Sequence, residues 1–257
     1  MSKSKHIWII TLFPELLRPF FENGIAGSAF RGERGPQFEI HLLNMRDFSA
    51  TNYKGVDDSP YGGGAGMVMR ADVLKAALFQ GVIEAGGYVG QWQEKLKVIM
   101  PSPRGVSWSQ KVCQEFSTDY LSADSPFDLV FICGRYEGID ERFIQRYVNM
   151  EISIGDYVLT GGEIATMAIL DSAIRFVPGA LGNAQSCLEE SFQEFLLEQP
   201  QYTRPREFEG MAVPQALLSG HHLEMARFQL AERERVTKER RPDLYQNYLK
   251  QQESSKK

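Results

Sequence analysis

The sequence is poor in cysteine, in net positive charge and in long apolar runs. Its three cysteines, Cys113, Cys133 and Cys187, are odd in number and have no CxxC spacing. A disulfide framework and a zinc site are therefore not expected, and a reducing compartment fits this usage. No stretch approaches the roughly 20 apolar residues of a membrane span, and the apolar run 7–13 is too short for a signal peptide. We expect a cytoplasmic protein without membrane association.

The charge balance is not that of an obvious nucleic-acid-binding protein. Lysine and arginine number 28 against 33 acidic residues, which gives a net charge of −5. A local basic face can still bind RNA within an acidic protein, so the net charge argues against a nucleic-acid partner without excluding one. With 43% hydrophobic and 24% charged residues among 257, the composition is that of a globular protein with one large domain or two smaller ones.

Two common phosphate-binding motifs are also missing. No glycine fingerprint follows the apolar run 7–11 and no GxxxxGK[ST] occurs, which argues against a dinucleotide-type Rossmann domain and a P-loop. The chain instead alternates short apolar runs with helix-like segments, the pattern of an α/β fold with a mostly parallel sheet. The expected strands are 7–11, 37–43, 96–100, 127–132 and 150–154, and the expected helices are 14–23, 71–79, 106–116 and 164–176.

Two glycine-rich segments directly follow the last two of these strands. They read CGRYEGID (133–140) and SIGDYVLTGGE (153–163). Glycine after a strand permits positive φ and lets a ligand approach the main chain, and loops at adjacent strand ends form one crevice in open α/β sheets. Either segment alone is better explained as a tight turn without a ligand. Together they favour a binding site, because they carry Arg135, Tyr136, Glu137, Asp156, Tyr157 and Glu163.

A third glycine-rich stretch, 62–66, lies within the segment 53–69. It is either a flexible linker or a loop that faces a substrate, and its neighbours Asp57, Asp58 and Tyr61 favour the second interpretation. The segment 101–105, which reads PSPRG, indicates on its own only a strand-to-helix turn.

The last part of the chain has a different character. The pattern breaks around 181–188, which predicts a linker, and from 191 onward the sequence is helical and charged without a strand signal. Seven basic residues there either bind RNA phosphates or pair with glutamates on a solvated helix face. They are Arg204, Arg206, Arg233, Arg235, Lys238, Arg240 and Arg241. Adjacent His221 and His222 would point apart on a helix, so they do not predict a metal site.

The segments 133–140 and 153–163, with 53–69 and 101–105, resemble the bacterial tRNA (guanine-N1)-methyltransferases of the SPOUT superfamily over nearly the whole chain. This resemblance implies an α/β fold whose mostly parallel sheet carries a SPOUT-type trefoil knot at its carboxyl side, plus a small all-α C-terminal domain. It divides the chain into a cofactor-binding domain (1–181), a linker (182–189) and a helical tRNA-binding domain (190–257). The implied partners are tRNA and a second copy of the chain, in a homodimer whose active site lies at the subunit interface.

The resemblance also implies the reaction and the residues that perform it. A methyl group would pass from S-adenosylmethionine to N1 of guanosine 37 in tRNA, with Glu190 as the base and Arg175 as the cation near the purine. No resident metal is expected, although Mg²⁺ assists the family and Glu137 is a candidate contributor. The implied substrate-binding residues are Asp57, Asp58, Tyr61, Gly64, Glu198 and Arg204. The implied cofactor-binding residues are Pro101, Ser102, Gly134, Tyr136, Glu137, Ser153, Ile154, Gly155, Tyr157, Leu159, Gly161 and Gly162.

The chain departs from the family pattern at several positions. Glu190 and Glu198 stand where the family commonly has aspartate, and Ala65 stands where it usually has proline. A glutamate moves the carboxylate by about one carbon–carbon bond, ~1.5 Å, and a misplacement of that size can cost ~10²-fold in rate. Our hypothesis is that the linker adjusts and the activity survives. The alternatives are a SPOUT methyltransferase that acts on another RNA and a non-catalytic RNA-binding factor.

Overall fold

The computed structural model describes residues 4–50, 53–180 and 191–254. The chain divides into two compact units, Met1–Gly182 and Asn183–Lys257. The predicted linker 182–189 and the predicted base Glu190 lie outside the described residues. Across the ranges that are described, no helix is long and apolar enough to cross a membrane.

The first unit is built on a five-stranded sheet in the order β2-β1-β6-β5-β7, and all of its pairings are parallel. This confirms the predicted α/β class and the mostly parallel sheet. The inner strands read as continuous apolar runs because both of their faces are covered by helices. The strands are β1 (Lys5–Thr11), β2 (Phe38–Asn44), β5 (Leu96–Ser107), β6 (Asp128–Ile132) and β7 (Met150–Ser153).

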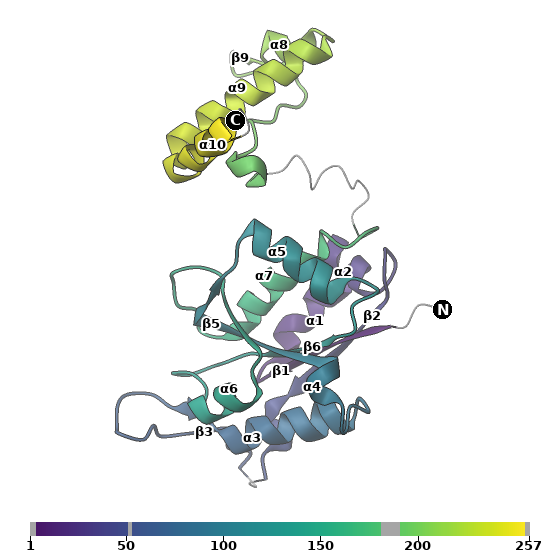
Figure 1. Ribbon diagram of the computed structural model, residues 1–257, viewed down its shortest axis with the longest axis vertical. Helices are drawn as coiled ribbons and strands as arrows, with labels where there is room; N and C mark the ends of the chain where they lie inside the picture. The colour runs from purple at the N-terminus through teal and green to yellow at the C-terminus, as the bar shows by residue number, and fades with distance from the viewer. Residues whose placement is uncertain (1–3, 51–52, 181–190, 255–257) are drawn as a thin grey trace. The chain divides into compact units, whose positions relative to one another are not determined.

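Helices cover the two faces of this sheet (Figure 1). On one face Ile9 and Phe131 pack in a core with α1 (Pro14–Glu22), α2 (Gly24–Phe30), α5 (Gln110–Phe116), the π-helix η3 (Ser117–Leu121) and α7 (Gly162–Ile174). On the other face Ile10 and Ile132 pack in a second core. Its covering elements are the 3₁₀ turn η1 (Met45–Phe48), α3 (Ala71–Ala76), the π-helix η2 (Ala77–Glu84), α4 (Trp92–Lys95) and α6 (Glu141–Tyr147).

Two local predictions were wrong, and one helix was missed. The helix expected over 106–116 begins only at Gln110, because β5 resumes pairing with β7 at Val106 after an excursion of the chain from Pro101. The predicted stop of the first helix at 23–24 is confirmed, since α1 ends at Glu22, but Gly24, with φ of +69°, begins a further helix, α2, which the sequence did not suggest. The connection expected from residue 81 is still helical, since η2 continues α3 to Glu84.

The second unit is mainly helical. Its two long helices pack through Tyr248 of α10, whose hydroxyl donates to Glu234 of α9 at 2.8 Å. The prediction that it contains no strand was wrong, because β8 and β9 pair across a turn in which Glu209 and Gly210 both have positive φ, as a tight hairpin requires. The elements are η5 (Gln193–Phe195), β8 (Glu207–Phe208), β9 (Met211–Ala212), α8 (Gln215–Leu218), α9 (His222–Arg240) and α10 (Pro242–Ser254).

Candidate active site

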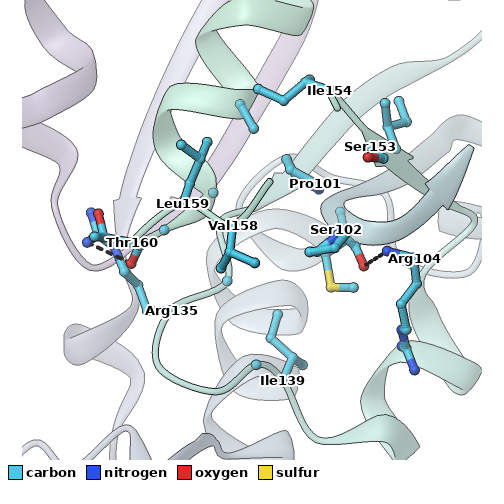
Figure 2. A pocket seen from close by; sticks show the side chains of 18 of the residues that line it. Pro101, Ser102, Arg104, Arg135, Ile139, Ser153, Ile154, Val158, Leu159 and Thr160 are labelled. Carbon is cyan, nitrogen blue, oxygen red and sulfur yellow. Dashed lines mark hydrogen bonds between the residues drawn. The ribbon is translucent and has the colours of Figure 1, made fainter. Parts of the chain in front are cut away.

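A pocket of about 420 Å³ lies beyond the carboxyl ends of β5, β6 and β7. Its walls are the three segments that leave these strands, 100–104, 134–144 and 152–165, as Figure 2 shows for the side chains of Pro101, Ile139, Ile154 and Leu159. A parallel sheet is expected to place its ligand site at this edge, and the volume falls in the range of small-molecule sites.

The structure brings together all of the residues that the resemblance assigns to the cofactor. Each of them lines this one pocket, although they come from three separate parts of the sequence. Their role as cofactor ligands stays a prediction. The lining contains Pro101, Ser102, Gly134, Tyr136, Glu137, Ser153, Ile154, Gly155, Tyr157, Leu159, Gly161 and Gly162.

Several further lining residues were missed at the level of sequence. They include the apolar side chains of Ile139, Ile144 and Val158, and the rim residue Arg104, which forms an ion pair with Glu141 at 3.0 Å. For most of them, the only feature of the sequence that could have predicted their place in the pocket is their position inside the same glycine-rich segments. Ile144 is different, because it lies on helix α6, after the glycine-rich segment. It lines the pocket because it is three residues after Glu141, on the same face of that helix.

The segment after Met100 forms the part of the wall that β5 contributes. The strand pairs with β7 up to Pro101 and again from Val106, so residues 102–105 leave the ladder, and 102–104 line the pocket. A β-carbon at position 105 would collide with the backbone of Glu151 and Ile152, so the excursion needs glycine there. The backbone N–H of Arg104 donates to the Ser102 hydroxyl at 3.2 Å and holds the turn in shape (Figure 2).

The amino end of α7 closes the pocket against the end of β6. The N–H of Gly162 donates to the carbonyl of Gly134 at 2.9 Å. A β-carbon at position 162 would lie 2.9 Å from Cys133 Cα, a distance that real β-carbons essentially never show, and 3.0 Å from the Gly134 nitrogen, which is tighter than nine in ten real contacts. Glycine is therefore the residue that lets this helix approach the strand end so closely.

An ion pair beneath the pocket connects three segments of the chain. Glu163 is only 1% exposed, and Arg135 approaches it at 2.9 Å. The Thr11 hydroxyl at the end of β1 donates to the same carboxylate at 2.6 Å. Arg135 also donates to the carbonyl of Thr160 at 3.2 Å (Figure 2) and lies 4.5 Å from the centre of the Phe13 ring. Glu163 thus supports the pocket wall, whereas Arg135 also lines the pocket.

The 53–69 segment forms a short hairpin whose base lies beside the pocket. Strands β3 (Asp57–Asp58) and β4 (Val68–Met69) pair antiparallel, and the N–H of Glu137 donates to the carbonyl of Met67 at 3.0 Å. Burial raises the pKa of the Tyr136 hydroxyl, and the nearby Asp57 carboxylate raises it further, so this hydroxyl stays protonated near neutral pH. Of the predicted substrate residues, Tyr61 is 98% exposed on the hairpin tip, close in sequence to Gly64.

The other predicted residues lie elsewhere. Arg175 follows the carboxyl end of α7, whereas the amino end of the same helix lines the pocket. Among the described residues that line the pocket, Arg175 does not occur. Glu198 and Arg204 belong to the second unit, where the Glu198 N–H donates to the Ser191 hydroxyl at 3.0 Å.

Two of the basic residues proposed for RNA are already paired within the second unit. Arg235 bonds Glu232 at 2.7 Å and Glu239 at 3.0 Å along α9, and Arg241 bonds Asp243 at 2.6 Å. For Arg235 this supports the helix-face interpretation, whereas Arg241 pairs at the junction between α9 and α10 and not along one helix face.

The fold and the pocket define the class: an α/β protein with a pocket of small-molecule size at the carboxyl edge of a parallel sheet. Within that class, residues 5–247 match the family described as tRNA (Guanine-1)-methyltransferase TrmD, and the chain belongs to this family. This confirms the family that the two glycine-rich motifs indicated.

Curated relatives agree over most of the chain. It is 47% identical over 236 residues to a tRNA (guanine-N(1)-)-methyltransferase of Brevibacillus brevis, covering 92% of this chain and 89% of the relative. It is 43% identical over 250 residues to a protein of the same name from Clostridium botulinum, covering 97% and 96%. A third, from Cereibacter sphaeroides, is 43% identical over 240 residues, covering 93% and 91%.

Proposed function

We propose that the protein transfers a methyl group from S-adenosylmethionine to N1 of guanosine 37 in tRNA, next to the anticodon. The observation that carries the proposal is the gathering of the predicted cofactor residues around one pocket in a member of this family. Its walls combine apolar side chains, which suit a purine ring, with glycine-rich main chain that a polar ligand can approach. When bound, the sulfonium compound supplies the methyl group, and the protein positions it.

We further propose that the pocket is formed by a SPOUT-type trefoil knot. The supporting feature is the path of the chain after β7. It runs through the pocket wall at 154–161 and then returns as α7 beside the end of β6, with Gly162 bonded to Gly134. Because the chain returns in this way, the three segments that follow β5, β6 and β7 line one pocket.

Methyl transfer to a ring nitrogen also needs a base and a cation near the purine. In our proposal Glu190 accepts the N1 proton and Arg175 offsets the charge that grows on the exocyclic oxygen. Helix α7 spans 13 residues, which is about 20 Å, so Arg175 is a helix length from the pocket of its own chain. This separation supports a homodimer in which one copy holds the cofactor and the other supplies Arg175 and Glu190.

Mixing two inactive variants tests the shared site. Ile154→Arg places a positive charge in the pocket and should prevent binding of the sulfonium, whereas Glu190→Ala removes the proposed base. Either variant alone should be nearly inactive, and their mixture should recover about a quarter or less of wild-type turnover through heterodimers with one intact site. A mixture that stays inactive while the subunits exchange, as tested by native mass spectrometry, contradicts the homodimer proposal.

The hairpin and the second unit are proposed to hold the tRNA. Asp57, Asp58, Tyr61 and Gly64 would face the guanine from the hairpin, and Glu198 and Arg204 would contact RNA from a helical tRNA-binding domain. The side chain of Glu137 lies against Gly66 and also lines the pocket, so substrate and cofactor segments meet there. Mg²⁺, if it assists, would act near this carboxylate. A cytoplasmic location fits a tRNA-modifying enzyme.

A methylation assay tests the proposed reaction against its alternatives. The protein, labelled S-adenosylmethionine and an unmodified tRNA transcript should give about one methyl group per tRNA, lost when guanosine 37 is changed to adenosine. Incorporation that ignores this change, or occurs only into other RNA, would assign another substrate. No incorporation with a properly folded protein would leave a non-catalytic RNA-binding factor. The Ile154→Arg variant is the matched control, since it should retain tRNA binding.

A further inference from the structure

A cluster of two histidines and a glutamate lies on the sheet, away from the pocket. His6 belongs to β1, and Glu39 and His41 belong to β2, which is an edge strand. The strand register pairs His6 with Glu39 and Trp8 with His41, so all four side chains share one face of the sheet. The sequence hides this cluster, because 35 residues separate the two histidines and the strands have to pair before the rings meet.

The spacing of the polar atoms is close to that of a metal site. His6 Nδ1 lies 2.9 Å from His41 Nε2 and 3.6 Å from Glu39 Oε2, and all three ligand atoms are within 4.8 Å of one another. A tetrahedral zinc ion with bonds of about 2.0–2.1 Å separates its ligand atoms by about 3.3 Å. The cluster therefore needs shifts of only a few tenths of an ångström between the two nitrogens. Without an ion, the two rings share one hydrogen bond.

Neighbouring groups hold the rings in place. The buried Trp8 ring stacks on His41 with centroids 3.8 Å apart and an angle of 14°. Trp8 in turn donates to the Tyr88 hydroxyl at 3.4 Å, and Tyr88 donates to Asp128 at 2.7 Å. The other oxygen of Asp128 accepts from the backbone N–H of His6 at 2.9 Å. The cluster is thus pre-organised, and Asp128 adds a second negative charge near it, which favours a cation.

We propose that His6, Glu39 and His41 bind one Zn²⁺ ion per chain. Two imidazoles and a carboxylate are a ligand set that suits zinc and leaves a further position for water. The His6 and Glu39 side chains are 26% and 48% exposed, so an ion from solution reaches them. The site cross-links the edge strand β2 to β1. It lies at the amino end of β1, about 17 Å along the strand from Thr11 at the pocket end.

Calorimetric titration of zinc chloride into chelator-treated, untagged full-length protein tests this site. The wild-type chain should bind one ion, and His41→Gln and Glu39→Gln should each bind it at least ten-fold more weakly. Cobalt(II) added in place of zinc should give the visible absorbance of a site with nitrogen and oxygen ligands, and this signal should be weakened by the same two changes. Methyl transfer by the two variants should stay close to that of wild type, because the ion lies away from the pocket.

A control variant removes the remaining histidines and one cysteine. His221→Asn, His222→Asn and Cys187→Ser together should leave zinc binding unchanged. If circular dichroism shows that His41→Gln does not fold, the zinc affinity of Glu39→Gln alone tests the site. Glu39→Gln changes an exposed carboxylate and should not disturb folding. Absence of binding by wild type, unchanged affinity in folded Glu39→Gln, or loss of binding in the control variant overturns the proposal.

Discussion

Replacing Arg135 by methionine is expected to lower the free energy of unfolding of the first unit by about 3–5 kcal/mol, the usual cost of removing one partner from a buried ion pair. Glu163 is 1% exposed, and Arg135 is the cation that approaches it. Methionine keeps the apolar stem of the side chain but lacks the guanidinium group, so the carboxylate beneath the pocket loses its counter-charge. The measurement is urea unfolding followed by circular dichroism.

Two further variants separate the ion pair from general damage. Arg104→Met removes another arginine that lines the pocket, but Arg104 itself is 59% exposed and neither of its partners, Glu141 (50% exposed) and Glu151 (24% exposed), is buried, so its loss should cost less than about 1 kcal/mol. The double variant Arg135→Met/Glu163→Gln removes both charges and should recover part of the lost stability. If Arg135→Met and Arg104→Met lower the free energy of unfolding equally, the burial of Glu163 is not what makes the Arg135–Glu163 ion pair important for stability.

The variant Gly162→Ala is expected to weaken binding of S-adenosylmethionine and to lower the rate of methyl transfer about 100-fold, the scale of a misplacement of about 1 Å of the reacting groups. The new β-carbon would come within 2.9 Å of Cys133 Cα and 3.0 Å of the Gly134 nitrogen. Both of these are main-chain atoms, which cannot rotate away as a side chain does. Helix α7 has to move off the end of β6, and the pocket wall moves with it.

Isothermal titration with S-adenosylmethionine and with its demethylated product measures this effect. The matched control is Ile164→Ala, on the same turn of α7, because Ile164 is exposed and its truncation leaves the helix against the strand. Gly162→Ala binding as tightly as Ile164→Ala would mean that the close approach is not needed for the site. Urea unfolding of both variants shows whether the weaker binding comes from global unfolding.

The sequence contained enough to predict the sheet and the gathering of the pocket residues. Apolar runs such as 7–11 and 127–132 are strands buried on both faces, and these leave a clear signal. The two glycine-rich segments follow β6 and β7, which are not adjacent as expected, because β5 lies between them. The segments still converge, because all three strands are parallel and end at the same edge of the sheet. The assignment of particular residues to the cofactor came from the family resemblance, and it stays a prediction.

Other features depend on contacts that no local pattern reveals. The resumption of β5 at Val106 is set by pairing with Ile152, which lies 46 positions further along the chain. The π-helix η2 and the turn at Glu209 carry no strong local signature. The histidine cluster arises only from the register of β1 with β2. The resumption of β5 and the histidine cluster are cases in which tertiary pairing decides the structure over local propensity.

The hydrogen bond between Thr11 and Glu163 joins positions 152 residues apart, and β1 pairs with β6 only after residue 128 has been made. On a ribosome that adds about 5–20 residues per second, the first strand therefore waits roughly 6–25 s for this neighbour. During synthesis β2 is the only one of its two neighbouring strands that has been made. The other edge of β1, with its unpaired backbone N–H and C=O groups, can therefore pair with strands of other chains. Nascent chains shorter than about 165 residues should lack a ligand site altogether and depend on chaperones to keep that edge from aggregating.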